Sequence, residues 1–222
     1  MSPENGPSRR NHWEDVYRRR PEEALSWFQA CPRVSLELLE NLGIGKTDSV
    51  IDIGGGASRL VDHLLERGFS RVTVLDIAES GLEAARVRLG SPVAGRVRWI
   101  EADVTEWSPD ARYRVWHDRA VFHFLTAPAD QDAYLRNLEA ALLPGADVLI
   151  ATFGPEGPER CSGLPVLRYS SESLARRMGP RFRIRDCREE EHQTPSGSLQ
   201  RFQYSVFHYD PGSFSTLTGG ST

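Results

Sequence analysis

Short apolar runs alternate with longer amphipathic segments along most of the chain. Five apolar runs predict strands, at residues 49–53, 71–77, 97–103, 113–118 and 146–153. The segments between them place apolar residues at helical spacing and predict helices at residues 57–67, 80–89 and about 129–143. Ser80 and Gly90 are the expected caps of the second of these helices. Strands that alternate with helices of this length indicate right-handed crossovers and a parallel sheet.

The two ends of the chain depart from this rhythm. Before the first strand, residues 11–20 and 34–42 predict two helices, the first with Trp13 and Tyr17 on one face. After the fifth strand, residues 182–193 and 199–209 read as strands joined by Thr-Pro-Ser-Gly, which predicts an antiparallel hairpin. We therefore expect an α/β three-layer sandwich with a seven-stranded, mostly parallel sheet that ends in a C-terminal hairpin.

Composition and charge fit one ordinary globular domain. The 222 residues are 39% hydrophobic and 26% charged, which is enough apolar material for a core. The formal net charge of −4 argues against a general nucleic-acid binder, and the arginine clusters at residues 18–20 and 176–177 are expected on solvated helix faces. We expect a disordered segment at residues 1–10, one domain over residues 11–210 and a flexible tail at residues 211–222.

The expected cellular location and the redox state of the cysteines follow from features that the sequence lacks. No apolar run approaches the roughly 18 residues that a membrane span needs, and residues 1–10 lack the apolar core of a signal peptide. The cysteines Cys31, Cys161 and Cys187 are widely spaced, which is untypical of a disulfide framework or of a metal site. We expect reduced cysteines in a cytoplasmic protein that has no metal and no nucleic-acid or membrane partner.

The first strand runs into a glycine-rich loop with the pattern Asp52-x-Gly54-x-Gly56. Gly54 and Gly56 allow a tight backbone turn and leave room for a ligand. A dinucleotide fingerprint would place a third small residue at position 59, and Arg59 stands there, which argues against NAD. A tight turn that binds nothing is the alternative interpretation.

Two further acids end the next two predicted strands. Asp76 follows Gly56 by about 20 residues, where a carboxylate can accept hydrogen bonds from both hydroxyls of a ribose. A capping role for Asp76 is the alternative, although Ser80 fills that role better. Asp103 ends the third predicted strand. Because the carboxyl ends of parallel strands share one sheet edge, these acids point to a ligand there.

The glycine loop, the strand-end acids and the terminal hairpin together resemble the class I, Rossmann-like methyltransferases that use S-adenosylmethionine (SAM). The resemblance implies that Asp52 fixes the methionine ammonium of the cofactor and that the loop takes its carboxylate and ribose region. It also implies that Asp103 takes the adenine amino group, and that the product is S-adenosylhomocysteine (SAH). The cofactor site expected from the resemblance comprises Trp13, Asp52, Gly54, Gly55, Gly56, Ser58, Asp76, Ile77, Asp103, Val104 and Asp118.

The fourth predicted strand ends at Asp118, beside the place where the resemblance puts the departing methyl group. Methyl transfer is an in-line displacement, so the protein mainly aligns the acceptor and excludes water. A general base is needed only where the acceptor arrives protonated, and Asp118 and His123 are the candidates. The alternatives are a cap or an ion pair with Arg119 for Asp118, and a packed core side chain for His123.

The branch of the family stays open between two patterns. Asp118-Arg119-Ala120 and Gly163-Leu-Pro-Val166 resemble the thiopurine and thiol S-methyltransferases, except that Val166 replaces the second proline of their loop. Trp13, Tyr17 and Ser26-Trp-Phe28 resemble uncharacterised bacterial members and a lysine-methyltransferase branch, whose Asp-Lys-Gly is absent. The resemblance further implies that residues 11–45 form a lid over the cofactor, and residues 154–169, with Cys161, are expected as a loop beside the site.

We expect an enzyme that methylates a nucleophilic sulfur, nitrogen or oxygen atom of a small molecule. A protein lysine methyltransferase and a SAM-binding module without catalysis are the alternatives.

Overall fold

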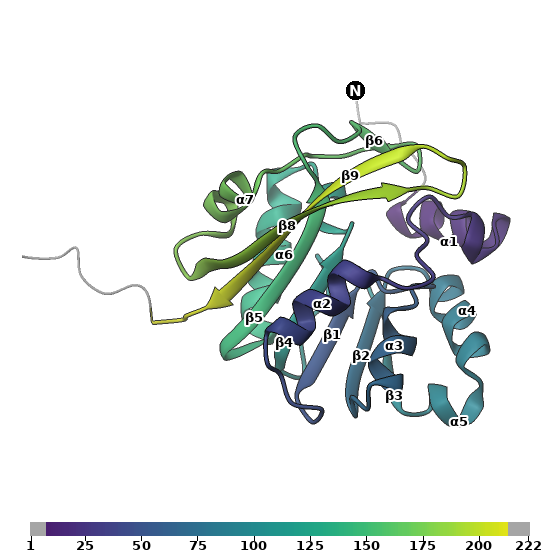
Figure 1. Cartoon of the computed structure of the whole chain (residues 1–222), viewed down its shortest axis with the longest axis horizontal. Helices are drawn as coiled ribbons and strands as arrows, with labels where there is room; N and C mark the ends of the chain where they lie inside the picture. Colours follow the sequence, from purple (N-terminus) through teal and green to yellow (C-terminus); the bar gives the residue numbers. More distant parts are fainter. Residues whose placement is uncertain (1–7, 213–222) are drawn as a thin grey trace, which may run out of the picture.

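Seven strands form one twisted sheet in the order β3-β2-β1-β4-β5-β9-β8 in the computed structural model, which describes residues 8–212 (Figure 1). The first five strands are parallel, and β9 runs antiparallel to both β5 and β8. This confirms the predicted α/β sandwich and its hairpin. The strands are β1 (Ser49–Ile53), β2 (Arg71–Asp76), β3 (Val97–Glu101), β4 (Tyr113–Arg119), β5 (Leu142–Phe153), β8 (Phe182–Gln193) and β9 (Leu199–Tyr209).

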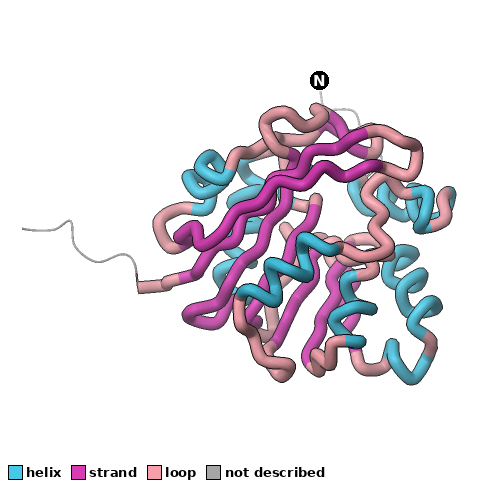
Figure 2. Tube along the Cα trace, viewed as in Figure 1, coloured by secondary structure: helices cyan, strands magenta, loops and turns pink. Residues whose placement is uncertain are grey.

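Helices cover both faces of the sheet (Figure 2). One apolar layer packs α2, α3 and α4 against side chains such as Val50 and Val115, and the other packs α6 and α7 against Ile51 and Trp116. Successive strand residues therefore alternate between the two layers, as a pleated strand requires. The helices are α1 (Arg9–Arg19), α2 (Arg33–Asn41), α3 (Leu60–Glu66), α4 (Glu79–Leu89), α5 (Ser91–Ala94), α6 (Pro128–Ala141) and α7 (Ser171–Met178), with short 3₁₀ turns at Glu22–Ala24 and Phe122–Phe124.

Several boundaries differ from the expected ones for local reasons. Helix α1 begins at Arg9, because the Ser8 side chain accepts a hydrogen bond from Asn11 N, so the last residues of the segment expected to be disordered are ordered. Helix α3 begins at Leu60 because the glycine-rich loop extends further than predicted. The loop at residues 154–169 contains a small hairpin of β6 (Arg160–Cys161) and β7 (Leu164–Pro165). Residues 1–7 and 213–222, which include most of the expected tail, lie outside the described residues.

The cap predicted for α4 is wrong. Helix α4 begins at Glu79, one residue before Ser80, and the residue at its N-cap, Ala78, has no capping side chain. The Glu14 carboxylate of α1 takes this role, since its Oε1 accepts hydrogen bonds from the backbone N of Glu79 at 2.8 Å and of Ser80 at 3.4 Å. A carboxylate suits the positive end of a helix dipole. Helix α1 is thereby fixed to the rest of the domain.

Among residues 8–212, no helix has both the length and the apolar character to cross a membrane.

Candidate functional site

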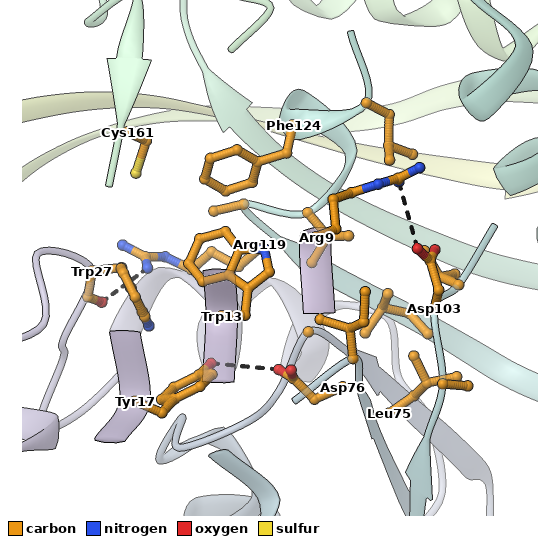
Figure 3. A pocket seen from close by; sticks show the side chains of 18 residues that line it. Arg9, Trp13, Tyr17, Trp27, Leu75, Asp76, Asp103, Arg119, Phe124 and Cys161 are labelled. Atoms are coloured by element: carbon orange, nitrogen blue, oxygen red, sulfur yellow. Dashed lines mark hydrogen bonds and ion pairs between the residues drawn. The ribbon is translucent and has the colours of Figure 1, made fainter. Parts of the chain in front are cut away.

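A cavity of about 740 Å³, partly open to solvent, lies at the carboxyl ends of the central strands and beneath α1 (Figure 3). This is the edge at which open α/β sheets bind their ligands. A more polar cavity of about 530 Å³ surrounds the glycine-rich loop, and both are lined by Trp27, Gly54 and Arg119. We call the first the aromatic cavity and the second the polar cavity.

The glycine-rich loop needs glycine for both conformation and space. Gly54 has a φ of 66° and Gly56 a φ of 31°, in the left-handed region that other residues avoid. A Cβ on Gly54 would lie 2.1 Å from Val121 Cγ2, and one on Gly56 would lie 2.7 Å from Asp76 Oδ2. The backbone therefore passes directly beside a buried carboxylate. Arg59, where a dinucleotide fingerprint needs a small residue, makes an ion pair with Glu22.

Asp52 is held by a chain of buried hydrogen bonds and lines the polar cavity. Its Oδ1 lies 2.7 Å from His117 Nδ1, and His117 Nε2 lies 2.9 Å from Ser35 Oγ. Its other oxygen, Oδ2, is buried and has no hydrogen-bond partner among the described residues. The chain fixes the carboxylate and leaves one oxygen for a cation or donor. Sequence reasoning missed His117 and Ser35, because nothing in the local pattern links α2 to β4.

Asp76 caps a turn and also faces the aromatic cavity. Its Oδ1 accepts a hydrogen bond from Ala78 N at 2.9 Å, and the Tyr17 hydroxyl lies 3.4 Å from its Oδ2. Burial raises the pKa of Asp76 to about 7. One oxygen of Asp76 therefore holds the turn before α4, while the other faces the cavity.

Asp103 divides its two oxygens in the same way. Its Oδ1 accepts hydrogen bonds from Thr105 N at 2.9 Å and from Thr105 Oγ1 at 2.7 Å. Its Oδ2 lies 3.7 Å from Arg9 Nη1, and Arg9 Nη2 lies 3.2 Å from Asp130. The neighbouring Val104 lines the cavity as well.

Helix α1 forms one wall of the aromatic cavity with three side chains spaced four residues apart, Arg9, Trp13 and Tyr17 (Figure 3). The Trp13 ring packs edge to face on Trp27, at 5.7 Å between centroids, and on Phe124, at 5.0 Å. The placement of Trp13 fits the cofactor site expected from the sequence. Tyr17 was expected on the same helix face and within the lid segment but not among the cofactor residues, although its four-residue spacing from Trp13 carries the signal.

Asp118 does not line either cavity. It is fully buried, and its carboxylate accepts hydrogen bonds from Val121 N at 2.8 Å, Phe122 N at 3.1 Å and the Tyr134 hydroxyl at 2.7 Å. Burial raises its pKa to about 6. These bonds hold the turn after β4, in which Ala120 has a φ of 72°. The placement corrects our expectation that Asp118 faces the cofactor and the methyl group.

His123 also lies away from both cavities. Its ring packs against Phe124 and Phe153, and its Nδ1 lies 3.3 Å from Phe153 N. Burial lowers the pKa of His123 to about 3, so the ring is neutral and weakly basic at physiological pH. The alternative interpretation of His123 was a packed core side chain, and the structure places His123 in this way.

Arg119 is a site residue that sequence reasoning assigned only as a partner of Asp118. Its Nε donates to the Tyr204 hydroxyl at 2.9 Å and its Nη1 to the Trp27 carbonyl at 3.1 Å, while Nη2 lies 3.6 Å from Glu190. Tyr204 and Glu190 belong to β9 and β8, so these partners hold the guanidinium toward the hairpin half of the sheet. A fixed cation therefore lines the side of the aromatic cavity toward β9.

Cys161, from the small hairpin, lines the same cavity (Figure 3). Burial raises the pKa of its thiol, which keeps the sulfur protonated.

The structure brings nearly all the expected cofactor residues together. One group lines the aromatic cavity: Trp13, Gly54, Asp76, Ile77, Asp103 and Val104. A second group lines the polar cavity: Asp52, Gly54, Gly55 and Ser58. Gly56 lies beside Asp76, and Asp118 alone of the expected set lies elsewhere.

Comparisons with known proteins agree with the fold. Residues 50–145 match the family described as "Methyltransferase domain". A structure solved in a study of the conversion of a disulfide bond into a thioacetal group during echinomycin biosynthesis superposes with a TM-score of 0.70 at 21% identity, covering 91% of this chain and 92% of that one. The 1,6-didemethyltoxoflavin-N1-methyltransferase of Burkholderia thailandensis, solved with 1,6-didemethyltoxoflavin and SAH, gives 0.65 at 22% identity, covering 90% and 84%.

Curated relatives match over shorter parts of their length. The mouse eEF1A lysine and N-terminal methyltransferase is 27% identical over 147 residues, which is 65% of this chain and 19% of that protein. The chain spans less than half the length of the curated relatives that it matches.

Proposed function

We infer that this chain, a member of the class I SAM-dependent methyltransferases, binds SAM across the two cavities and transfers its methyl group to a small-molecule acceptor. The observation that carries the proposal is the set of three acids around the glycine-rich loop and the cavities. Asp52 keeps one buried oxygen without a hydrogen-bond partner among the described residues, whereas the second oxygens of Asp76 and Asp103 meet only Tyr17 and Arg9 of α1, which line the same cavity. Related structures contain SAH beside this kind of fold.

Each of these acids meets a different part of the proposed ligand. Asp52 Oδ2 is the acceptor for the methionine ammonium, because an anion with an unpaired buried oxygen favours a cation. Asp76 Oδ2 accepts from the ribose hydroxyls in place of, or alongside, the Tyr17 hydroxyl. Asp103 Oδ2 accepts from the adenine amino group. When bound, SAM supplies an activated methyl group on a sulfonium sulfur.

The chain contributes alignment and exclusion of water to the reaction. Trp13, Trp27 and Phe124 pack edge to face and enclose the aromatic cavity. Asp118 and His123 do not reach that cavity, so we propose that neither of these two side chains takes a proton from the acceptor. An acceptor that is already nucleophilic, or one that loses its proton to water, fits this arrangement. Positioning and desolvation then account for the rate.

The lining of the cavity favours a small molecule over a protein lysine. The space lies beneath α1 and is lined by aromatic rings, and small-molecule sites are typically concave and mostly apolar. The Arg119 guanidinium lines this cavity and would repel a lysine ammonium at close range. A protein acceptor is the second candidate, and the relatives that methylate eEF1A favour it.

Calorimetry with SAH and with NAD tests the first part of the proposal. We expect SAH to bind and NAD to give no heat, and the opposite result would refute cofactor use of this kind. A screen scored by SAH release then compares small molecules with lysine-containing peptides. Turnover confined to peptides would favour the second candidate, and SAH binding without any turnover would favour a non-catalytic module.

A further inference from the structure

A separate hollow lies at the opposite edge of the sheet, where β1 to β4 begin. It has a volume of about 540 Å³, and the side chains of Arg71, Arg96, Arg98 and Arg112 converge on it. In Figure 1 this edge is at the bottom of β1, β2 and β3, while α1 lies at the other end of these strands. Neither the glycine-rich loop nor any strand-end acid contributes to its lining.

The positive charge of this hollow is largely uncompensated. The side chains of Arg71, Arg96 and Arg112 have no hydrogen bond or ion pair with any residue in the described range 8–212, and all three residues are exposed. Arg98 is paired with Asp110, its Nη2 lying 2.6 Å from Asp110 Oδ2. Arginines elsewhere in the domain, such as those that meet Glu22, mostly have a carboxylate partner. A concentration of free guanidinium groups in a chain of net charge −4 needs its own explanation.

A buried hydroxyl in the same lining points to a ligand independently of the arginines. Tyr113 lines the hollow and is only 2% exposed, yet its hydroxyl has no hydrogen-bond partner among the residues described. A buried hydroxyl left unpaired costs free energy. A ligand that accepts a hydrogen bond would remove this cost.

We propose that this hollow is a second binding site, and that its ligand is a small molecule with two or more phosphate groups. Guanidinium groups bind phosphate oxygens through paired, charge-assisted hydrogen bonds. Three free guanidinium groups exceed the charge of a single carboxylate or monophosphate, so a polyphosphate matches them better. The Tyr113 hydroxyl donates to one of its oxygens.

This site is distinct from the proposed cofactor site. Arg71 begins β2 and Asp76 ends it, so their Cα atoms lie about 16 Å apart at the usual rise of about 3.3 Å per residue. A diphosphate or triphosphate at the arginines therefore leaves both cavities at the carboxyl edge free. The two sites can be filled together.

If the arginines had a purely structural role, their removal would have a different effect. Helices α3 and α5 end near this edge, at Glu66 and Ala94, and cations stabilise the carbonyl end of a helix. If that were the whole role of Arg71 and Arg96, their removal would lower stability and anions would not bind.

The test uses sodium tripolyphosphate as the probe, titrated calorimetrically into the full chain with SAH present to occupy the cofactor cavities. We expect binding of one tripolyphosphate per chain, weaker at high salt and unchanged by SAH. The double variant Arg71→Gln, Arg112→Gln should lose at least about tenfold in affinity. The matched control is Arg33→Gln, Arg136→Gln, which removes the same charge from two exposed arginines on α2 and α6 that also lack a partner among the described residues, and should stay within about twofold.

Equal loss in both double variants would show general charge attraction and overturn the site, as would absence of binding in the wild type. The variant Tyr113→Phe sharpens the test, because it removes only the unpaired hydroxyl. We expect several-fold weaker tripolyphosphate binding with a melting temperature that is unchanged or higher. Unchanged binding would overturn the site as described. Stronger binding of single-stranded oligonucleotides than of tripolyphosphate would overturn the assignment to a small molecule.

Discussion

Asp76 and Asp118 end two strands of the same sheet and are both buried, yet they serve different parts of the molecule. Burial raises the pKa of each carboxyl, to about 7 for Asp76 and to about 6 for Asp118. Asp76 lines the aromatic cavity, whereas Asp118 has both oxygens occupied by the turn after β4 and by Tyr134. A perturbed acid at a strand end is therefore not by itself a sign of a site.

The alternation of side chains along each strand places Asp52 and Asp118 on opposite faces of the sheet, and the hydrogen bonds to the turn after β4 and to Tyr134 keep Asp118 out of the cavities. Asp52 lies beside His117 in the register of β1 and β4, and Ile53 lies beside Asp118. Asp118 thus shares the face of Ile53, which packs in the layer of α6 and α7, while Asp52 shares the opposite face. A position at the carboxyl end brings a residue to the edge of the sheet, and the parity of the strand decides which side it faces.

The largest expected effect is on stability. Asp118→Ala leaves Val121 N, Phe122 N and the Tyr134 hydroxyl without an acceptor, so we expect the free energy of unfolding to fall by about 3–5 kcal/mol. Denaturant unfolding measures it, and Asp15→Ala, an exposed acid on α1, is the control, with a change below about 0.5 kcal/mol. Wild-type stability together with lost turnover would place Asp118 at the site after all.

The next effect is on cofactor affinity. Asp76→Ala removes the proposed acceptor for the ribose hydroxyls, so SAH binding should weaken by about 2–3 kcal/mol in calorimetry. Stability should change little, because the variant also removes a charge that burial disfavours. The folded fraction of Asp118→Ala should bind SAH as the wild type does. Equal weakening in both variants would break the contrast between the two acids.

The pH dependence of binding follows from the raised pKa of Asp76. Below about pH 7 the free protein holds this carboxyl protonated, and the protonated group is a poorer acceptor for the ribose. SAH affinity should therefore fall as pH decreases below about 7, by up to about tenfold per unit, and level off above it. Asp76→Asn should show no such dependence, and a wild-type profile that stays flat between about pH 6 and 8 would count against the assignment.

The smallest expected effect is on stability and concerns Glu14, whose carboxylate attaches α1 to the start of α4. Glu14→Gln replaces the charge that caps α4, so we expect a loss of about 0.5–1 kcal/mol in unfolding free energy. Ser80→Ala should cost less, since Ser80 lies inside the helix rather than at its cap. A larger loss for Ser80→Ala would restore the capping role predicted from the sequence.

The sequence predicted the parts of the fold that depend on local pattern. The bounds of β1, β8 and β9 agree with the structure, because apolar alternation and turn residues define them. The glycine-rich loop and the acids of β1 to β3 were placed correctly for the same reason, since each follows an unmistakable strand. The position of Asp118 was not predicted, because its hydrogen bonds to the turn after β4 and to Tyr134 of α6 are tertiary contacts that the strand pattern does not show.

Other contacts could not be read from any local window. The Ser35–His117–Asp52 chain joins α2, β4 and β1, and its members are up to 82 residues apart in the sequence. Glu14 displaced Ser80 as the cap of α4 because a side chain from another helix reached the same backbone groups. Arg119 faces the cavity because partners on β8 and β9 hold it there.

The attachment of α1 to the domain affects how fast a ligand in the aromatic cavity can exchange with solvent. The helix lies over the aromatic cavity and is tied to the domain through Glu14, Tyr17 and Arg9. A ligand enclosed beneath it exchanges only when these contacts open, so exchange can be slow even where affinity is modest. Release of product, rather than methyl transfer, then becomes the step that limits repeated turnover. Weakening the contacts of Glu14, Tyr17 and Arg9 would in that case give a faster enzyme that binds its cofactor less tightly.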